Sequence, residues 1–141
     1  MSASAEQVVR DFHAAVSRHD FDRLAELLDD GASYEVCGIE LEGAGVFDKA
    51  TVLRILPGML SLFEPGSPRM TITRLFRDGD WIIMEGNGEG RFRNGALYEN
   101  RYIIVHEVLD GRIRTIREYM DTQHAASIFA AVAESPSHEE S

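Results

Sequence analysis

The sequence predicts an α+β fold in which helices pack on one face of a strongly curved antiparallel sheet. The first half of the 141-residue chain carries apolar residues at helical spacing, and from Arg69 onward nearly every segment has the composition of a strand. Helices followed by a run of strands are typical of this class. The length is that of one domain, so we expect residues 1–133 to form a single domain and residues 134–141 a disordered acidic tail.

Two helices are predicted to open the chain. Ser4 is a suitable N-cap for the first, whose apolar face includes Phe12. Asp20 is a suitable N-cap for the second, which is predicted to end at Asp29-Asp30-Gly31. A short strand over residues 32–37 and a glycine-rich loop over 38–45 should follow.

A third helix is predicted to begin near Asp48, with Pro57-Gly58 either kinking or ending it. Four long strands in a meander follow, and glycine-containing turns separate them. The last turn, Asp110-Gly111, lies between arms rich in β-branched and aromatic residues, which is the strongest short-range hairpin signal in the chain. Residues 122–133 are alanine-rich and compatible with a final helix.

Composition excludes several classes of partner. The net charge is -10, and no cluster of Lys or Arg could follow a phosphate backbone or an anionic membrane. Cys37 is the single cysteine, so no intramolecular disulfide and no zinc site are expected. The chain has neither a signal-peptide pattern nor an apolar run long enough to span a bilayer. We expect a cytoplasmic protein that binds no nucleic acid, membrane, metal or cofactor.

An unusual segment, EGNGEG at residues 85–90, lies inside a predicted strand. Period-two alternation puts Glu85, Asn87 and Glu89 on one face and three glycines on the other. In one interpretation the polar side chains enter a cavity while the glycine face bends the sheet or meets another subunit. In the other, the polar side chains face water.

Glu118 is the most promising acid or base in the sequence. It lies between Ile116 and Met120 on one face of the last strand, where partial desolvation would raise its pKa into the range of a general base or acid. A structural ion pair with Arg101 across the hairpin is the alternative.

The order of the elements and the run NRYIIVHEVLDGRIRTIREYMDT, residues 100–122, resemble the SnoaL-like proteins. These belong to the nuclear-transport-factor-2-like superfamily, together with ketosteroid isomerases and limonene-epoxide hydrolases. The resemblance implies a cone-shaped, half-open barrel wrapped around the N-terminal helices, an internal apolar pocket, and commonly a homodimer formed through the sheet. The fold hosts several chemistries, so it does not by itself define an activity.

The catalytic residues of the named enzymes are not reproduced. Where ketosteroid isomerases carry a tyrosine and two acids, this sequence has Phe12, Val36 and Ile103. Matching the epoxide hydrolases without gaps gives Glu85, Asn87 and Glu118, with a carboxylate in place of the arginine. The match nevertheless implies that these three side chains point into the pocket.

Polyketide cyclases of this group rely on one acid/base carboxylate, for which Glu118 is the candidate here and Asp121 the alternative. We therefore predict Glu118, Asn87 and Glu85 as catalytic residues. The substrate-binding residues are predicted to be Tyr34, Phe12, Arg101, Ile103, Ile116, Met120 and Trp81.

The predicted function is that of a cofactor-free acid/base enzyme, of isomerase, cyclase or hydrolase type, acting on an apolar carbonyl- or epoxide-bearing compound. Glu118 would accept a proton, and Asn87 and Tyr34 would donate hydrogen bonds to an oxyanion or a water. The alternative is a non-catalytic small-ligand-binding or accessory dimeric domain, and an interaction module is a third interpretation.

Overall fold

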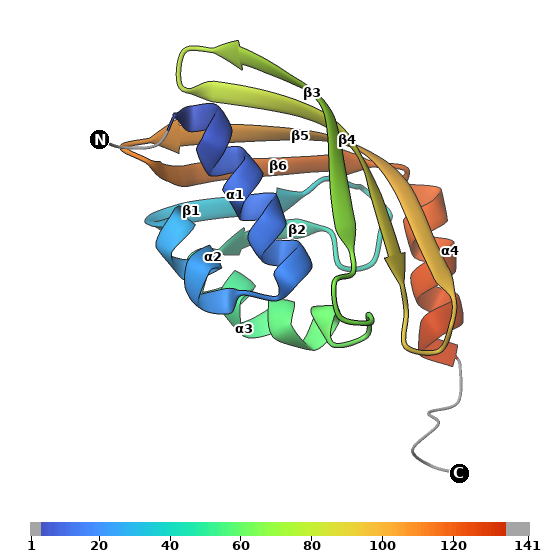
Figure 1. Cartoon of the computed structure of the whole chain (residues 1–141). Coiled ribbons are helices and arrows are strands. Elements are labelled where there is room, and N and C mark those ends of the chain that lie inside the picture. Colours follow the sequence, from blue (N-terminus) through green and yellow to red (C-terminus); the bar gives the residue numbers. More distant parts are fainter. Residues whose placement is uncertain (1–3, 135–141) are drawn as a thin grey trace.

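A computed structural model describes residues 4–134 and shows helices packed within a curved sheet (Figure 1). Residues 135–141, most of the predicted tail, lie outside the described residues. The helices are α1 (Ala5–Arg18), α2 (Phe21–Leu27), α3 (Lys49–Leu60) and α4 (Thr122–Glu134). The strands are β1 (Leu28–Val36), β2 (Gly45–Asp48), β3 (Arg69–Asp78), β4 (Trp81–Arg91), β5 (Leu97–Leu109) and β6 (Arg112–Met120).

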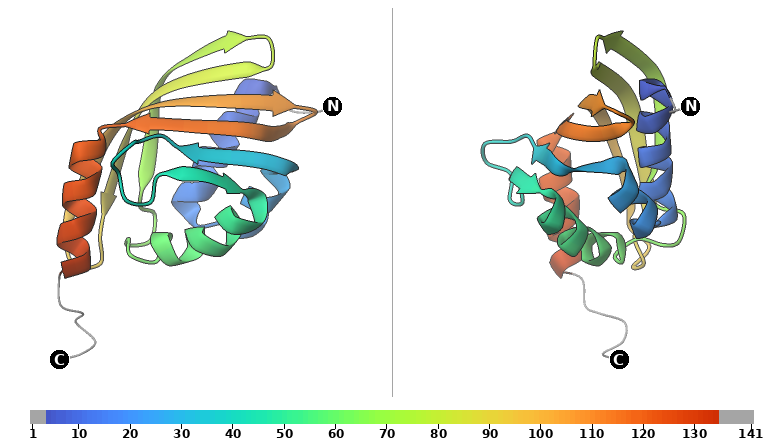
Figure 2. Two further views of the ribbon diagram at one scale, coloured as in Figure 1. Left: turned by 180° about the vertical axis from the view of Figure 1, so that it is seen from behind. Right: turned by 90° about the vertical axis from the view of Figure 1, so that its left-hand side faces the viewer.

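The six strands form one open sheet in the order β2-β1-β6-β5-β4-β3. The predicted four-strand meander, β3 to β6, is confirmed, with antiparallel pairing throughout. The sheet as a whole is mixed, because β1 runs parallel to β6. The sheet bends so that β3 and β4 stand steeply to β1 and β2, and α1, α2 and α3 occupy the concave side (Figure 2). The α+β class and cone-shaped architecture are therefore confirmed.

The helix starts follow the predicted caps. Ser4 Oγ accepts a hydrogen bond from the Gln7 amide at 3.1 Å, and Asp20 Oδ1 accepts one from the Arg23 amide at the same distance. Asp48 accepts from the Thr51 amide at 2.8 Å. These side chains satisfy amides that have no partner inside the helix.

The first two strands differ from the prediction. β1 begins at Leu28 rather than at residue 32, because Asp29-Asp30-Gly31 continues the strand instead of forming a turn. Its pairing with β6 is irregular between Leu28 and Ser33. β2 was not predicted, since a four-residue edge strand is too short to show a period. The third helix continues through Pro57 to Leu60.

The glycine-rich segment of β4 points its glycines inward. A Cβ added at Gly88 would lie 2.6 Å from Cε2 of Tyr102, and one added at Gly90 would lie 2.9 Å from the Phe63 ring. At Gly86 the Cβ would lie 2.9 Å from the Thr71 carbonyl oxygen. Gly88 and Gly90 therefore make room for inner aromatic rings. The interpretation in which the glycine face meets another subunit is wrong, because that face points inward.

Substituting Gly88 with alanine should displace the Tyr102 ring, because the added methyl cannot fit beside it. We expect a loss of about 1–3 kcal/mol in the free energy of unfolding, measured by urea titration. Gly58→Ala is the matched control, since a Cβ there meets nothing within 4 Å and alanine favours the helix by up to about 1 kcal/mol. Equal stability of the two variants would contradict the packing role.

A β-bulge explains why neither set of alternate residues in the last strand, 112–120, is continuously apolar. The β5–β6 register shifts between Glu107 and Val108, so that Ile113 and Ile116 both point inward and are 0% and 1% exposed. The extra residue changes the alternation, and beyond it Ile116, Glu118 and Met120 follow the inner face.

Candidate active site

Glu118 lies on the inner face of the sheet, on β6. It is paired with the fully buried Ile104 of β5, and its Oε1 accepts a hydrogen bond from the Tyr34 hydroxyl at 2.9 Å. Burial raises the pKa of Glu118 from 4.5 to about 7, and the Tyr34 hydrogen bond opposes part of that rise. A carboxyl group with a pKa near neutrality can both accept and donate a proton under ordinary conditions.

Accessibility along the inner face is graded. Ile82, Ile104 and Ile116 are 0–1% exposed, whereas Glu118 and Tyr102 keep intermediate accessibility. The same holds for Tyr34 and Met120, which are also half-buried. The end of the inner face that carries Glu118 is therefore its more accessible end.

A second polar network lies next to Glu118 on β5. The hydroxyls of Tyr98 and Tyr102 form a short hydrogen bond with each other, and Asn100 Nδ2 donates to the Tyr98 hydroxyl at 3.0 Å. Burial and the Glu118 charge raise the pKa of Tyr102, so its hydroxyl stays protonated. Glu118 is thus surrounded by neutral phenols rather than by cations.

Two histidines form a separate buried pair between α1 and the sheet. Nε2 of His13 and Nε2 of His106 are 3.0 Å apart, and His106 Nδ1 lies 3.2 Å from the Ile82 carbonyl oxygen. Burial lowers the pKa of both rings, that of His106 to about 4. Both rings are therefore neutral at pH 7, and one must donate to the other.

Several residues predicted for the site lie on the opposite face. The pairing Met84↔Ile104↔Glu118 puts the even-numbered residues of β4 on the Glu118 side. The prediction that Glu85 and Asn87 point into the pocket with Glu118 is therefore wrong. The match to the epoxide hydrolases put the odd-numbered residues of β4 on the inner face. The even-numbered residues, which include the glycines, lie there instead, because the inner aromatic rings need the space beside the glycines.

The outer face also carries Trp81, Arg101 and Ile103. Asn87 pairs with Arg101, Ile103 pairs with Tyr119, and the Arg117 guanidinium lies 5.7 Å from the Trp81 ring centre. These three residues do not line the inner face, so their predicted positions are corrected. The alternative ion pair between Arg101 and Glu118 is excluded, because a sheet separates the two side chains.

The remaining predicted residues are on the inner side. Phe12 and Ile116 are each 1% exposed and belong to the core, while Met120 pairs with Tyr102 at the accessible end. Asp121, the alternative base, is exposed, and its Oδ1 accepts a hydrogen bond from the His124 amide at 3.1 Å at the start of α4. Asp121 is thus a helix cap.

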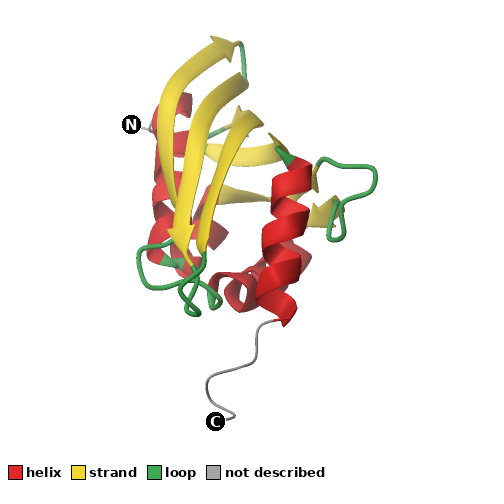
Figure 3. Ribbon diagram, turned by 90° about the vertical axis from the view of Figure 1, so that its right-hand side faces the viewer, coloured by secondary structure: helices red, strands yellow, loops and turns green. Residues whose placement is uncertain are grey.

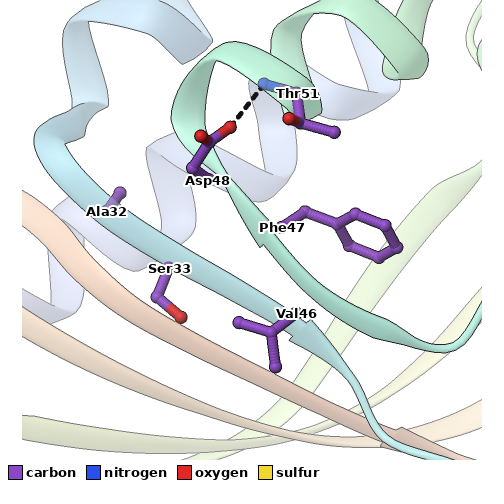
Figure 4. A pocket seen from close by; sticks show the side chains of 6 residues that line it. All are labelled: Ala32, Ser33, Val46, Phe47, Asp48 and Thr51. Atoms are coloured by element: carbon purple, nitrogen blue, oxygen red, sulfur yellow. Dashed lines mark hydrogen bonds between the residues drawn. The ribbon is translucent and has the colours of Figure 1, made fainter.

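Two surface hollows lie elsewhere. One, of about 450 Å³, is lined by Ala32, Ser33, Val46, Phe47, Asp48 and Thr51 (Figure 4). Its one carboxylate, Asp48, is engaged in capping α3. The other, of about 340 Å³, lies between α1 and β3 and includes His13. Neither hollow contains Glu118.

Across residues 4–134, no group of three or more His, Cys, Asp and Glu side chains is placed to hold a metal ion. No helix in that part of the chain is long and apolar enough to cross a membrane.

The network residues Tyr98, Asn100 and Tyr102 were not predicted as site residues. They share one parity on β5, and Gly88 of β4 lies directly opposite Asn100. The sequence did contain a signal for them. Tyr98, Asn100 and Tyr102 lie on one face of a predicted strand, and the neighbouring strand carries glycines opposite them.

The fold is shared with solved structures. A proposed isomerase from Bacillus subtilis is 26% identical, with a TM-score of 0.77, and the match covers 89% of this chain and 92% of that one. IdmH, a proposed polyketide cyclase from Streptomyces antibioticus, is 16% identical, with a TM-score of 0.73 and coverage of 91% and 99%. An NTF2-like protein from Burkholderia xenovorans LB400 is 23% identical, with a TM-score of 0.69 and coverage of 87% and 93%.

No curated protein matches the chain. The family model described as SnoaL-like domain matches residues 9–116, which span α1 to the middle of β6 and include Tyr34, Tyr98 and Tyr102. This match covers more than half of the sequence and agrees with the observed fold, so the protein belongs to the SnoaL-like domain family.

Proposed function

We propose that this protein is a cofactor-free acid/base enzyme that moves a proton on an apolar carbonyl compound, with Glu118 as the base. The observation that carries the proposal is the Glu118 carboxyl group, which burial holds at a pKa of about 7 at the accessible end of the inner face. A general base is most effective when its pKa is near the working pH. The fold shared with a proposed polyketide cyclase, IdmH, is consistent with this class.

The proposed step is enolisation. The Glu118 carboxylate takes a proton from the carbon next to a carbonyl, the C–H electron pair forms a carbon–carbon double bond, and the carbonyl π pair moves to oxygen. Returning the proton at another carbon gives an isomer, and attack of the enolate carbon on a second carbonyl closes a ring. Neither outcome needs an oxidant or a metal.

Tyr34 has a different role from the one predicted. Its hydroxyl donates to Glu118 Oε1, so its proton is already used and Tyr34 orients the base instead of binding the substrate oxygen. The hydrogen bond leaves the other carboxylate oxygen, Oε2, to face the substrate. Apolar side chains of α3, Leu53 and Leu56, are half-buried against the core and would contact an apolar ring system.

The test is exchange of the α-hydrogens of 2-tetralone, an apolar ketone, in D₂O followed by NMR. We expect exchange that rises with pH up to about 7 and then levels, because the base is the ionised form of Glu118. Glu118→Gln should reduce exchange by at least about 10²-fold. Glu89→Gln, an exposed carboxyl on the outer face of the same sheet, is the matched control and should exchange at the wild-type rate.

Exchange by the wild type at the rate of buffer, together with saturable binding of the ketone, would favour the second candidate, a non-catalytic binding domain. Such a domain would use the same accessible end of the inner face. For either function we propose a homodimer through the outer face of the sheet, where Phe76, Ile103 and Tyr119 are 46%, 41% and 47% exposed.

A further inference from the structure

Asn100 is held in one orientation by four hydrogen bonds. Its Oδ1 accepts from the backbone amides of Arg101, at 2.8 Å, and Asp121, at 3.0 Å. Its Nδ2 must then be the donor, and it donates to the Asp121 carbonyl at 3.1 Å and to the Tyr98 hydroxyl at 3.0 Å. Because amide nitrogen cannot accept, the direction of every bond that Asn100 makes is fixed.

The fixed orientation of Asn100 also determines which tyrosine hydroxyl donates in the hydrogen bond between Tyr98 and Tyr102. A hydroxyl has one proton to give, and the described contacts of the Tyr98 hydroxyl are Asn100 Nδ2 and the Tyr102 hydroxyl. If the Tyr98 oxygen accepted from both neighbours, its own proton would have no acceptor among these contacts, although the side chain is only 5% exposed. The direction that satisfies the buried hydroxyl has Tyr98 giving its proton to the oxygen of Tyr102. The proton of Tyr102 is then left for a partner outside the chain Asn100–Tyr98–Tyr102.

Tyr102 is placed beside Glu118 on the inner face. Tyr102 pairs with Met120 and Ile104 pairs with Glu118, so Tyr102 and Glu118 are diagonal neighbours on adjacent antiparallel strands. Such neighbours have Cβ atoms about 7 Å apart, within reach of long side chains. The ring of Tyr102 lies across Gly88, which has no side chain to displace it.

We propose that Tyr102 is a catalytic residue that donates its hydroxyl proton in a hydrogen bond to the oxyanion formed when Glu118 removes a proton, with Tyr98 and Asn100 as positioning residues. The proposal rests on the function proposed above and narrows its substrate class. The substrate would carry the acidic C–H and the carbonyl oxygen close together, as in a ketone that enolises, because the base and the donor lie on neighbouring strands. An epoxide, which has no α-carbonyl, is not favoured.

The arrangement also explains the division of work between the tyrosines. Tyr34 gives its proton to the base, and Tyr102 receives a hydrogen bond from Tyr98 that strengthens it as a donor. A neutral donor suits an oxyanion better than a cation would here, because an arginine beside Glu118 would lower the pKa of the base.

The test uses 4-nitrophenol, which does not react and whose ionised form absorbs visible light. It is bound to Glu118→Gln, which removes the competing carboxylate charge, and its ionisation is followed by absorbance across pH. We expect the bound phenol to ionise at lower pH than in water. In Glu118→Gln/Tyr102→Phe that shift should disappear and the phenolate should bind at least about tenfold more weakly. Adding Tyr119→Phe instead, at a tyrosine that is 47% exposed on the outer face, should leave both unchanged.

Tyr98→Phe is the probe of the positioning residues and should give a smaller loss of the same shift. Gly88→Ala keeps the Tyr102 hydroxyl but displaces the ring, so in the Glu118→Gln background it should reproduce the Tyr102→Phe result. In 2-tetralone exchange by the enzyme with Glu118 intact, Tyr102→Phe should lower kcat by about 10²–10³-fold with little change in KM.

An unchanged phenol shift in the Tyr102→Phe double variant, or no binding of the phenol to Glu118→Gln, would overturn the inference. The phenol measurement requires no turnover, so it separates the two proposals. A phenol shift that depends on Tyr102, without any ketone exchange by the wild type, would reject the enzymatic function and keep Tyr102 as a ligand-binding donor.

Discussion

Replacing Glu118 with glutamine is expected to make the protein more stable at pH 8, by about 3 kcal/mol in the free energy of unfolding. Burial raises the pKa of Glu118 from 4.5 to about 7. Between these values the folded protein holds a proton that the unfolded chain has released, so the Glu118 contribution to stability falls as pH rises through this window. Above pH 7 the folded state carries a poorly solvated charge. Glutamine removes that charge and keeps an oxygen that can accept from Tyr34.

Urea titrations of wild type and Glu118→Gln at pH 4.5, 6, 7 and 8 would measure this effect. The gap between them should open as pH rises and be smallest at pH 4.5, where the wild-type carboxyl is protonated in the folded state and half protonated in the unfolded chain. Glu89→Gln should follow the wild type throughout. A Glu118→Gln variant that is less stable than wild type at pH 8 would show that the carboxylate is well solvated and would undermine its role as a base.

Acid should destabilise the protein through the His13–His106 pair. Burial lowers the pKa of His106 from 6.5 to about 4, so between these values the unfolded chain binds a proton that the folded ring does not. The His106 contribution to stability is fully present above pH 6.5 and is lost as pH falls, by about 3 kcal/mol at pH 4. Charging both rings 3.0 Å apart is not tolerated, so the loss belongs to the pair.

The measurement is the free energy of unfolding of His106→Gln against pH. Glutamine does not titrate, so this variant should be less stable than wild type at pH 7.5, where it replaces a well-packed ring, yet should lose less on going to pH 4.5. His124→Gln, a histidine on α4 outside the pair, serves as control and should retain the wild-type slope. An unchanged slope in His106→Gln would mean that the pair does not govern acid stability.

The two buried groups act in opposite directions over the same pH range. From pH 6.5 down to 4.5, protonation of Glu118 favours the folded state while the His13–His106 pair favours the unfolded chain. Their effects therefore partly cancel in the wild type. Each single variant exposes the other group: Glu118→Gln should show a steeper acid loss than wild type, and His106→Gln should show a smaller one.

The parts of the structure that follow from local pattern were predictable. Capping by Ser4 and Asp20, the Asp110-Gly111 hairpin and the meander depend on residues close in sequence. The parallel pairing of β1 with β6 was not, because about 80 residues separate the partners and nothing in either strand specifies the other.

The site was predicted in part. Glu118 was identified because a carboxylate between two apolar residues of one face is unusual, and the structure puts it on the inner face. The orientation of β4 was wrong, since alternation defines two faces without saying which one is inside. That choice depends on volume: Tyr102 and Phe63 need the space above Gly88 and Gly90, and the aromatic rings come from distant segments.

The open sheet leaves two strands at its margins, and their construction bears on how the protein behaves at high concentration. A long flat margin would offer free amides and carbonyls to strands of other molecules and so promote aggregation. β2 is only four residues long, and β3 has an irregular register between Ile72 and Arg74. Figure 3 shows the long strands of the curved sheet from this side, with helix α4 beside them. With Arg69, Arg74 and Arg77 along β3, ordered stacking of strands between molecules is disfavoured, and concentrated solutions should resist fibril formation.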